Sequence, residues 1–237
     1  MTVTLVHLYP SEMNIYGDHG NIITLVQRLR WRGIGVEVRR VGVGDDLDLH
    51  TADLVFGGGG QDHGQIAVAA DLTRHAAALR GAVDDGLVVL AVCGIYQLFG
   101  HRFRTSDGHE LPGVGIFDAD TVGSPDRLIG NVVIDSDWGE IVGFENHSGK
   151  TTLGPGQAAL GRVIQGYGNN GEDGREGAVR ANAFGTYLHG SLLPKNPAFA
   201  DELLRRALAR RGLPADLTPL DDTLAAKAAA VAKERPQ

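Results

Sequence analysis

The sequence predicts an α/β fold in which a mostly parallel central sheet is flanked by helices. Three observations favour it: strand-like and helix-like segments alternate through the first half of the chain, the strand-like segments are short and apolar, and glycines follow several of them. In the second half the pattern changes to short alternating segments, which indicates added antiparallel strands.

The first three expected elements lie within residues 3–41. Val3–Leu8 is a short apolar run and is expected to be a strand. Asn21–Arg32 is expected to be a helix, because apolar residues recur there at helical spacing and Gly33 follows as a stop. Val36–Val41 is the next expected strand.

The next group of elements leads to the only cysteine of the chain. Ala52–Phe56 is expected to be a buried strand that runs into four glycines, and Asp62–Arg80, rich in alanine and leucine, is expected to be a helix. Leu87–Val92 is again strand-like and stops at Cys93. A further helix is expected to begin near Gly94.

The second half has a different rhythm from about His109. Runs such as GNVVIDS and EIVGFEN are separated by Gly, Asp and Pro and are expected to be antiparallel strands that decorate the sheet. Ala183–Leu188 is the last expected strand. Asn196 and Pro197 form a cap followed by proline, so a helix is expected from there to Arg211.

These elements are expected to form one domain over residues 1–212, followed by a tail over 213–237. The sequence shows no internal repeat and no convincing linker. The Pro- and Ala-rich tail contains Thr223–Glu234, which is expected either to form a polar terminal helix or to fray.

Composition excludes several classes of function. The net charge of −7 and the lack of Lys/Arg-rich runs argue against a nucleic-acid partner. No apolar run approaches the roughly 20 residues of a membrane span, and the start of the chain does not look like a signal peptide. A single cysteine forms no intrachain disulfide, so the expected location is the cytoplasm.

Cys93 is the first candidate for chemistry. Most free cysteines are small buried hydrophobic residues. Here the strand VVLAV ends at the thiol and a helix is expected to begin at Gly94, which would lift the side chain above the carboxyl edge of the sheet. The helix N-terminus favours a thiolate, and the N–H of Gly94 is free to approach an oxyanion. We therefore interpret Cys93 as a nucleophile.

His189 is the candidate base for that nucleophile. It also follows a strand-like run and precedes a glycine, so a parallel sheet would place it at the same edge as Cys93. The run of glycines at 57–60 ends a strand at this edge as well. It does not match a nucleotide-binding motif, and an oxyanion site that faces Cys93 fits it better.

Two other kinds of site are rejected from the sequence. Ser148–Thr151 reads SGKT, like the end of a phosphate-binding loop, but the glycine that this motif requires upstream is Phe144. No short-spaced cluster of metal ligands occurs, so no metal is expected.

Five stretches in order carry a family resemblance: YPSEMNIYGDHGNI, FGGGGQD, AVCGIYQLFG, GFENHSGKT and TYLHGSLL. Together they resemble the class I glutamine amidotransferases, which have a flavodoxin-like fold. Within that class they are similar to the cobyric-acid-synthase-like branch and to the glutaminase subunits of lipid II isoglutaminyl synthases. The resemblance runs from about Leu5 to Leu193, most of the chain.

The resemblance implies hydrolysis of L-glutamine through a cysteine thioester. Cys93 would attack the side-chain amide, and His189 would activate the thiol and protonate ammonia. The N–H groups of Gly94 and of Gly59 or Gly60 would hold the oxyanion. Arg127, in SPDRLIGN, stands where the family has an arginine that binds the α-carboxylate of glutamine. Gln97 is expected either to line the same pocket or to pack against the strand-to-helix turn at Cys93, here called the elbow.

One position departs from the wider family. Many class I amidotransferases have a glutamate two residues after the catalytic histidine, whereas this chain has Ser191. The histidine would then act in a dyad, or another carboxylate would orient it. Asp18 and Glu145 are the two candidates for that carboxylate.

The resemblance also implies partners. Ammonia would pass to a Mur-ligase-like, ATP-dependent subunit that amidates the D-glutamate of lipid II to D-isoglutamine, in a heterodimer. No cofactor is expected in this chain, and ATP and Mg²⁺ would bind to the partner. The alternatives are a cobyric-acid-type acceptor, a catalytically silent scaffold of the same fold, and a cysteine hydrolase that acts on esters or peptides.

Overall fold

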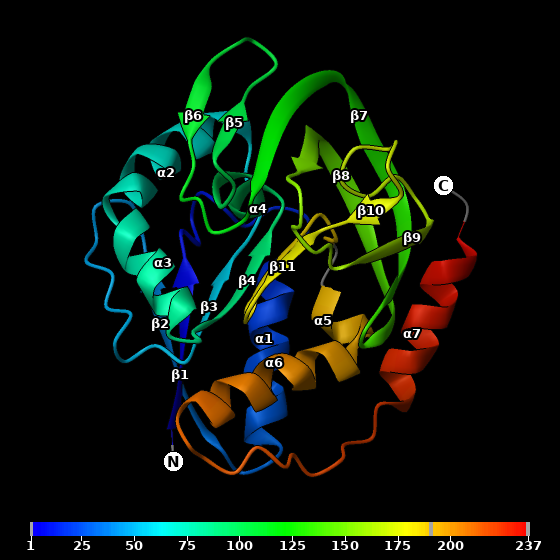
Figure 1. The fold of residues 1–237 in the computed structure, drawn as a ribbon. Coiled ribbons are helices and arrows are strands. Elements are labelled where there is room, and N and C mark those ends of the chain that lie inside the picture. The colour runs from blue at the N-terminus through cyan, green and yellow to red at the C-terminus, as the bar shows by residue number, and fades with distance from the viewer. Residues whose placement is uncertain (1, 190–191, 236–237) are drawn as a thin grey trace.

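The computed structural model describes residues 2–189 and 192–235 and shows two sheets packed side by side (Figure 1). The first sheet has the order β11-β12-β4-β3-β1-β2. Its parallel strands are β1 (Thr2–Leu8), β2 (Gly35–Val41), β3 (Leu54–Gly57), β4 (Val88–Val92) and β12 (Ala183–Thr186). The edge strand β11 (Ala178–Arg180) pairs antiparallel with β12. The parallel strands follow the flavodoxin-like order, which confirms the predicted fold class.

Helices cover this sheet on both faces. The first crossover, from β1 to β2, runs through α1 (His19–Arg30), and the crossover from β3 to β4 runs through α2 (Asp62–Arg74) and α3 (Ala76–Asp84). The two crossovers step in opposite directions along the sheet, so right-handed connections place their helices on opposite faces. The helix α6 (Pro197–Arg210) packs beside α1 and contacts β3 and β4.

The expected helix at 62–80 continues to residue 84 but is split. The helix is interrupted at His75, which is the C-cap of α2 and the N-cap of α3. Alanine and leucine fit both helices equally well, so composition could not mark this break. The short helix α4 (Gly94–Leu98) follows Cys93, as the sequence predicts.

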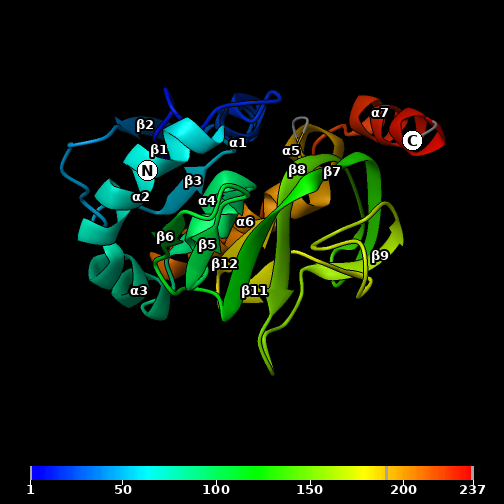
Figure 2. The same ribbon diagram turned by 90° about the horizontal axis from the view of Figure 1, so that it is seen from above.

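The second half forms a sheet of its own, where the sequence predicted strands that decorate the first sheet. Its order is β10-β9-β7-β5-β6, with β8 paired to β7. The strands are β5 (Arg102–Arg104), β6 (Glu110–Pro112), β7 (Ala119–Ser136), β8 (Gly139–Leu153), β9 (Gly161–Gln165) and β10 (Arg175–Glu176). Figure 2 shows β7, β8 and β9 to one side of the helix-covered sheet. Phe144 of β8 forms an isolated bridge with His189, so the β7–β8 hairpin brings the FENHS segment beside the carboxyl end of β12.

The C-terminal part is anchored to the body. After α5 (Leu192–Lys195) and α6, residues 213–222 run over the surface, where Leu213, Ala215 and Leu217 pack partly against the core. The last helix α7 (Thr223–Glu234) contacts α5, β7 and β8 and buries none of its residues fully. Among the described residues, no helix combines the length and apolarity that a bilayer crossing requires.

Candidate active site

Cys93 occupies a strained turn between β4 and α4. Its φ of 48° lies in the left-handed region, which non-glycine residues rarely adopt. The turn is held on both sides, because the N–H of Cys93 donates to Thr186 O at 2.8 Å and its carbonyl accepts from Gln97 N–H at 2.9 Å. Such strain costs on the order of 1–3 kcal/mol and persists only where the surroundings fix it. The turn has the geometry of a nucleophile elbow, in which a buried thiol at the carboxyl end of β4 lines a cavity.

Gly94 allows the loop of glycines at 57–60, here called the glycine loop, to approach the elbow. A Cβ on Gly94 would lie 2.8 Å from Gln65 Nε2 and 3.0 Å from the backbone nitrogen of Gly60. No larger residue fits between α4 and the loop that follows β3. The glycine loop and the start of α4, which the sequence predicts at the same edge of the sheet, are therefore in direct contact.

His189 meets Cys93 across this loop. A Cβ on Gly59 would lie 2.4 Å from His189 Cε1 and 3.2 Å from Cys93 Cβ, so the imidazole and the cysteine flank the same glycine. The backbone of His189 is tied to Phe144 of β8, with the His189 N–H donating to Phe144 O at 2.6 Å. His189 is fully buried, and its Nε2 has no hydrogen-bond partner among the described residues.

The electrostatics of the site favour a protonated His189. Burial lowers the pKa of its imidazole, but the charges of Cys93 and Asp18 outweigh burial and raise the pKa to about 10. The arrangement suits an imidazolium beside a thiolate, which is the reactive form of a cysteine nucleophile.

Of the two candidate carboxylates, the structure brings Asp18 to His189. The Asp18 oxygens lie 3.0 and 3.1 Å from His189 Nδ1. Glu145 instead accepts the N–H groups of Tyr167 and Gly168, at 2.6 and 2.9 Å, and lies 3.6 Å from His147 Nε2. Glu145 is therefore not the residue that orients His189. Position 191, where the wider family has its glutamate, lies outside the described residues.

The structure also corrects the expectation for Gly59 as an oxyanion donor. Its N–H donates to Asp18 Oδ2 at 2.7 Å and is therefore engaged. The N–H groups of Gly60 and Gly94 make no hydrogen bond within the described part of the chain. These two donors, on opposite sides of the elbow, remain for an oxyanion.

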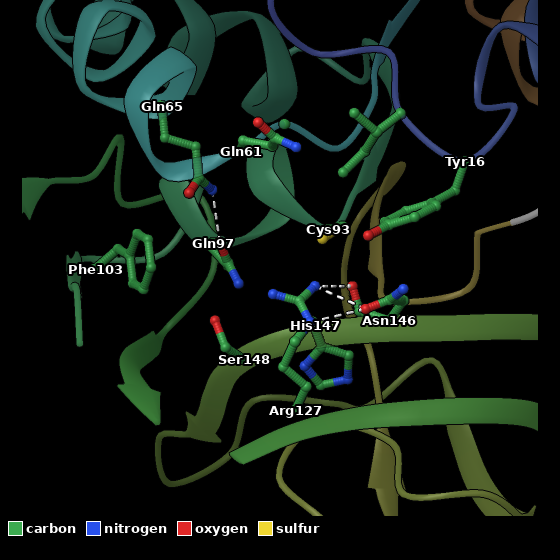
Figure 3. Close-up of a pocket in the computed structure, with 12 residues that line it drawn as sticks. Tyr16, Gln61, Gln65, Cys93, Gln97, Phe103, Arg127, Asn146, His147 and Ser148 are labelled. Atoms are coloured by element: carbon green, nitrogen blue, oxygen red, sulfur yellow. Dashed lines mark hydrogen bonds between the residues drawn. The ribbon is translucent and has the colours of Figure 1, made fainter. Parts of the chain in front are cut away.

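A cavity of about 370 Å³ opens above Cys93 and suits a small polar ligand (Figure 3). Arg127 reaches into it from a register shift between Gly123 and Leu128 in β7. Its Nε and Nη2 donate to Asn146 Oδ1, at 3.0 and 2.7 Å, and Nη2 also donates to Asn146 O at 3.1 Å. Asn146 therefore holds the guanidinium at the cavity, and among the described residues Nη1 has no hydrogen-bond acceptor.

Gln97 lines the cavity and also holds the elbow region together, so both expectations for it describe the structure. Its Oε1 accepts from Gln65 Nε2 at 2.7 Å, and its Nε2 donates to the hydroxyl of Tyr187 at 3.2 Å. Cys93, Gln97, Gly60 and Arg127 line this cavity, whereas His189 is not among its lining residues and flanks Gly59 beside Cys93.

Sequence reasoning did not predict several residues of the site, among them Tyr16, Gln65 and Asn146, which line the cavity, and Tyr187, which contacts Gln97. Tyr16, which has a positive φ of 53°, forms a T-shaped pair with His189, with 5.1 Å between ring centroids. Tyr16 and Asn146 lie in two of the segments that carry the family resemblance, and their polar side chains are the signal that could have found them. Gln65 carries no local signal.

Comparisons with known proteins agree with this geometry. The CobB/CobQ-like glutamine amidotransferase domain matches residues 4–197. The GatD subunit of the glutamine-hydrolysing lipid II isoglutaminyl synthase of Staphylococcus aureus is 42% identical over 93% of this chain and 90% of its own length. Its counterpart in Streptococcus pneumoniae is 38% identical over 88% and 82%. A cobyric acid synthase of Pelotomaculum thermopropionicum is 32% identical over 76% of this chain but only 36% of its own length.

Solved structures support the fold. One glutamine amidotransferase superposes with a TM-score of 0.57 at 13% identity and covers 85% of this chain and 98% of its own. A second, from Thermotoga maritima, gives a TM-score of 0.53 at 15% identity, covering 98% and 93%. With the matched domain, the chain belongs to the CobB/CobQ-like glutamine amidotransferase family.

Proposed function

We propose that this chain is the glutamine-hydrolysing subunit of a lipid II isoglutaminyl synthase. The observation that carries the proposal is the single thiol at a strained elbow, beside an imidazole that a buried carboxylate orients, in a cavity that contains a guanidinium. The identity to two GatD subunits over most of their length supports the choice of complex.

The residues of the elbow fit hydrolysis of the glutamine side-chain amide. The Cys93 thiolate attacks the amide carbon, and the N–H groups of Gly60 and Gly94 stabilise the oxyanion. Nε2 of the His189 imidazolium gives its proton to the leaving nitrogen, which departs as ammonia and leaves a thioester. Water, deprotonated by the now neutral imidazole, cleaves the thioester and releases glutamate and the thiolate.

Recognition of glutamine rests on the other end of the cavity. Arg127 is fixed by Asn146 and directs Nη1 to the α-carboxylate, for which a guanidinium is well suited. Gln97 lines the same cavity as Arg127 and Cys93. The cavity then holds glutamine with its side chain directed to the thiol.

Ammonia released here needs an acceptor that another subunit activates. The sequence has no phosphate-binding loop motif, so ATP and Mg²⁺ would bind to a Mur-ligase-like partner that amidates the D-glutamate of lipid II. A cobyric-acid-type acceptor is the second candidate. It is less well supported, because the matched cobyric acid synthase is much longer than the segment that aligns with this chain.

The test of hydrolysis uses Cys93. Cys93→Ala and Cys93→Ser should each reduce glutamate release from glutamine by at least about a thousandfold, because no thioester forms. Retained activity in Cys93→Ala would refute the proposal. The acceptor is tested separately: the chain co-purified with its ligase subunit should amidate lipid II when ATP and glutamine are supplied, and amidation of a cobyric-acid-type acceptor instead would favour the second candidate.

A further inference from the structure

Gln65 is a buried polar residue that takes no part in the proposed steps of glutamine hydrolysis. It lies on α2, is 2% exposed, and lines the cavity opposite Arg127 and Ser148 (Figure 3). Its Nε2 donates to Gln97 Oε1 at 2.7 Å, across the contact between α2 and α4. A buried amide on a covering helix thus bonds directly to an amide that faces the reacting centre.

This bond is the first in a buried chain of hydrogen bonds. Gln97 Nε2 donates to the Tyr187 hydroxyl at 3.2 Å, and that hydroxyl lies 2.7 Å from Thr151 Oγ1. Thr151 Oγ1 is in turn 2.7 Å from Thr121 Oγ1. This series of hydrogen bonds therefore connects α2, α4, the segment after β12 and the β7–β8 hairpin.

The two ends of the Gln97 amide are held by different elements. One lone pair of Oε1 is bound by Gln65, and one N–H of Nε2 is bound by Tyr187. No described residue bonds to the second N–H or to the second lone pair, so both are available to a ligand in the cavity. Without both supports the amide has no fixed direction, because its oxygen and nitrogen ends have the same shape.

We propose that Gln65 is a positioning residue, which sets the direction of the Gln97 amide and thereby the affinity of the cavity for glutamine. The proposal rests on the proposed glutaminase function. Gln65 acts through Gln97 and not on the reacting atoms, so its loss should change the affinity for glutamine more than the rate of the chemical step. Tyr187 performs the matching role at the other end of the amide.

Two substitutions separate this role from packing. Gln65→Met keeps the length of the side chain and removes its donor, while Tyr187→Phe keeps the ring that stacks on His147 and removes only the hydroxyl. Each should raise the KM for glutamine about tenfold, equivalent to one well-placed hydrogen bond, with kcat changed less than about threefold. Gln27→Met, at a half-buried glutamine of α1, is the matched control and should leave both constants unchanged.

A double-mutant cycle with Gln97→Met tests whether Gln65 acts through Gln97. In that background Gln65→Met and Tyr187→Phe should have no further effect on KM, because the amide that they orient is gone. Glutamate release is measured for the chain with its ligase subunit. The Kd for glutamine is measured by calorimetry in the Cys93→Ala background, where turnover does not interfere.

The outcomes are distinct. Additive effects of Gln65→Met and Gln97→Met, or a fall in kcat with unchanged KM, would overturn the positioning role. If Gln65→Met does not fold, Tyr187→Phe carries the same comparison and its additivity would count equally against the proposal. A wild-type chain that releases no glutamate would overturn the proposed function itself, whereas normal wild-type release with an additive cycle would overturn only the role of Gln65.

Discussion

At the scale of single residues, Asp18 contacts both His189 and the glycine loop beside Cys93. One carboxylate accepts from His189 Nδ1 and from the N–H of Gly59, so it orients the imidazole and fixes the glycine loop together. Asp18 is fully buried, and charge-assisted hydrogen bonds to a buried carboxylate are among the stronger ones in proteins. Because the N–H of Gly59 donates to Asp18, it is not available to an oxyanion.

Asp18→Asn should therefore reduce kcat for glutamine hydrolysis by about 10²–10⁴, because the neutral amide supports neither the imidazolium nor its tautomer. Stopped assays of glutamate release measure it. Glu145→Gln is the contrasting variant: it removes an equally buried carboxylate that contacts backbone N–H groups instead of His189. Its folded fraction should keep kcat within a few-fold, and a larger loss there than in Asp18→Asn would contradict this assignment.

The pKa of His189 provides a second check at this scale. Burial lowers it, and the charges of Cys93 and Asp18 raise it to about 10. Cys93→Ser removes the sulfur, which is one of the groups that raise the pKa of His189, so this pKa should fall while the effect of Asp18 remains. An NMR titration of the imidazole in both proteins measures the change, and an unchanged or higher pKa in Cys93→Ser would show that Cys93 does not act on the ring.

At the scale of elements, the elbow depends on a close fit between α4 and β12. A Cβ on Gly185 would lie 2.2 Å from Tyr96 Cδ2 and 2.9 Å from Phe117 Cε2. Both rings are buried and packed edge to face, so neither can move aside. The glycine lets α4 lie close to the sheet and keeps Cys93 at its height above the edge.

Gly185→Ala should lower the free energy of unfolding by about 1–3 kcal/mol through overpacking. Gly81 offers the control, since it lies in α3 and a Cβ there would meet nothing within 4 Å. Gly81→Ala should raise stability by roughly 0.4–1 kcal/mol, because alanine is the better helix former. Urea unfolding of the two variants measures both changes, and equal effects of the same sign would refute the packing argument.

The strands and helices that carry the site were predictable from the sequence where neighbouring residues alone determine the element. The apolar run before Cys93 and the glycine after it predict both the strand and the elbow. The choice between Asp18 and Glu145 was not predictable, because Asp18 lies 171 positions from His189 and only the packed fold brings them together. The same reason hid Gln65, whose partner Gln97 lies on another helix.

At the scale of the whole molecule, the segment after residue 212 is tied to the first helix through charge. Arg28, whose side chain is 4% exposed, donates to Asp201 of α6 and to Asp222, at 2.6 Å each. Arg32 also donates to the carbonyl of Thr218 at 2.8 Å. The expected division at residue 212 therefore separates a buried arginine from one of its two carboxylates.

Two truncations distinguish the parts of this segment. A chain that ends at residue 222 keeps Asp222 and loses α7, which buries no residue fully and makes an exposed ion pair between Lys233 and Glu140. Such pairs contribute about 0–1 kcal/mol, so the melting temperature should change by only a few degrees.

A chain that ends at residue 212 should lose considerably more stability. It leaves Arg28 with Asp201 alone and uncovers the apolar surface under Leu213 and Leu217. Loss of one carboxylate from a buried arginine and of partly buried leucines costs roughly 2–4 kcal/mol together, or about 4–16 °C in melting temperature at this chain length. Thermal unfolding of both truncations decides the point. If the two proteins melt at the same temperature, Asp222 and the segment before α7 do not anchor the fold, and residues 1–212 are a complete folding unit.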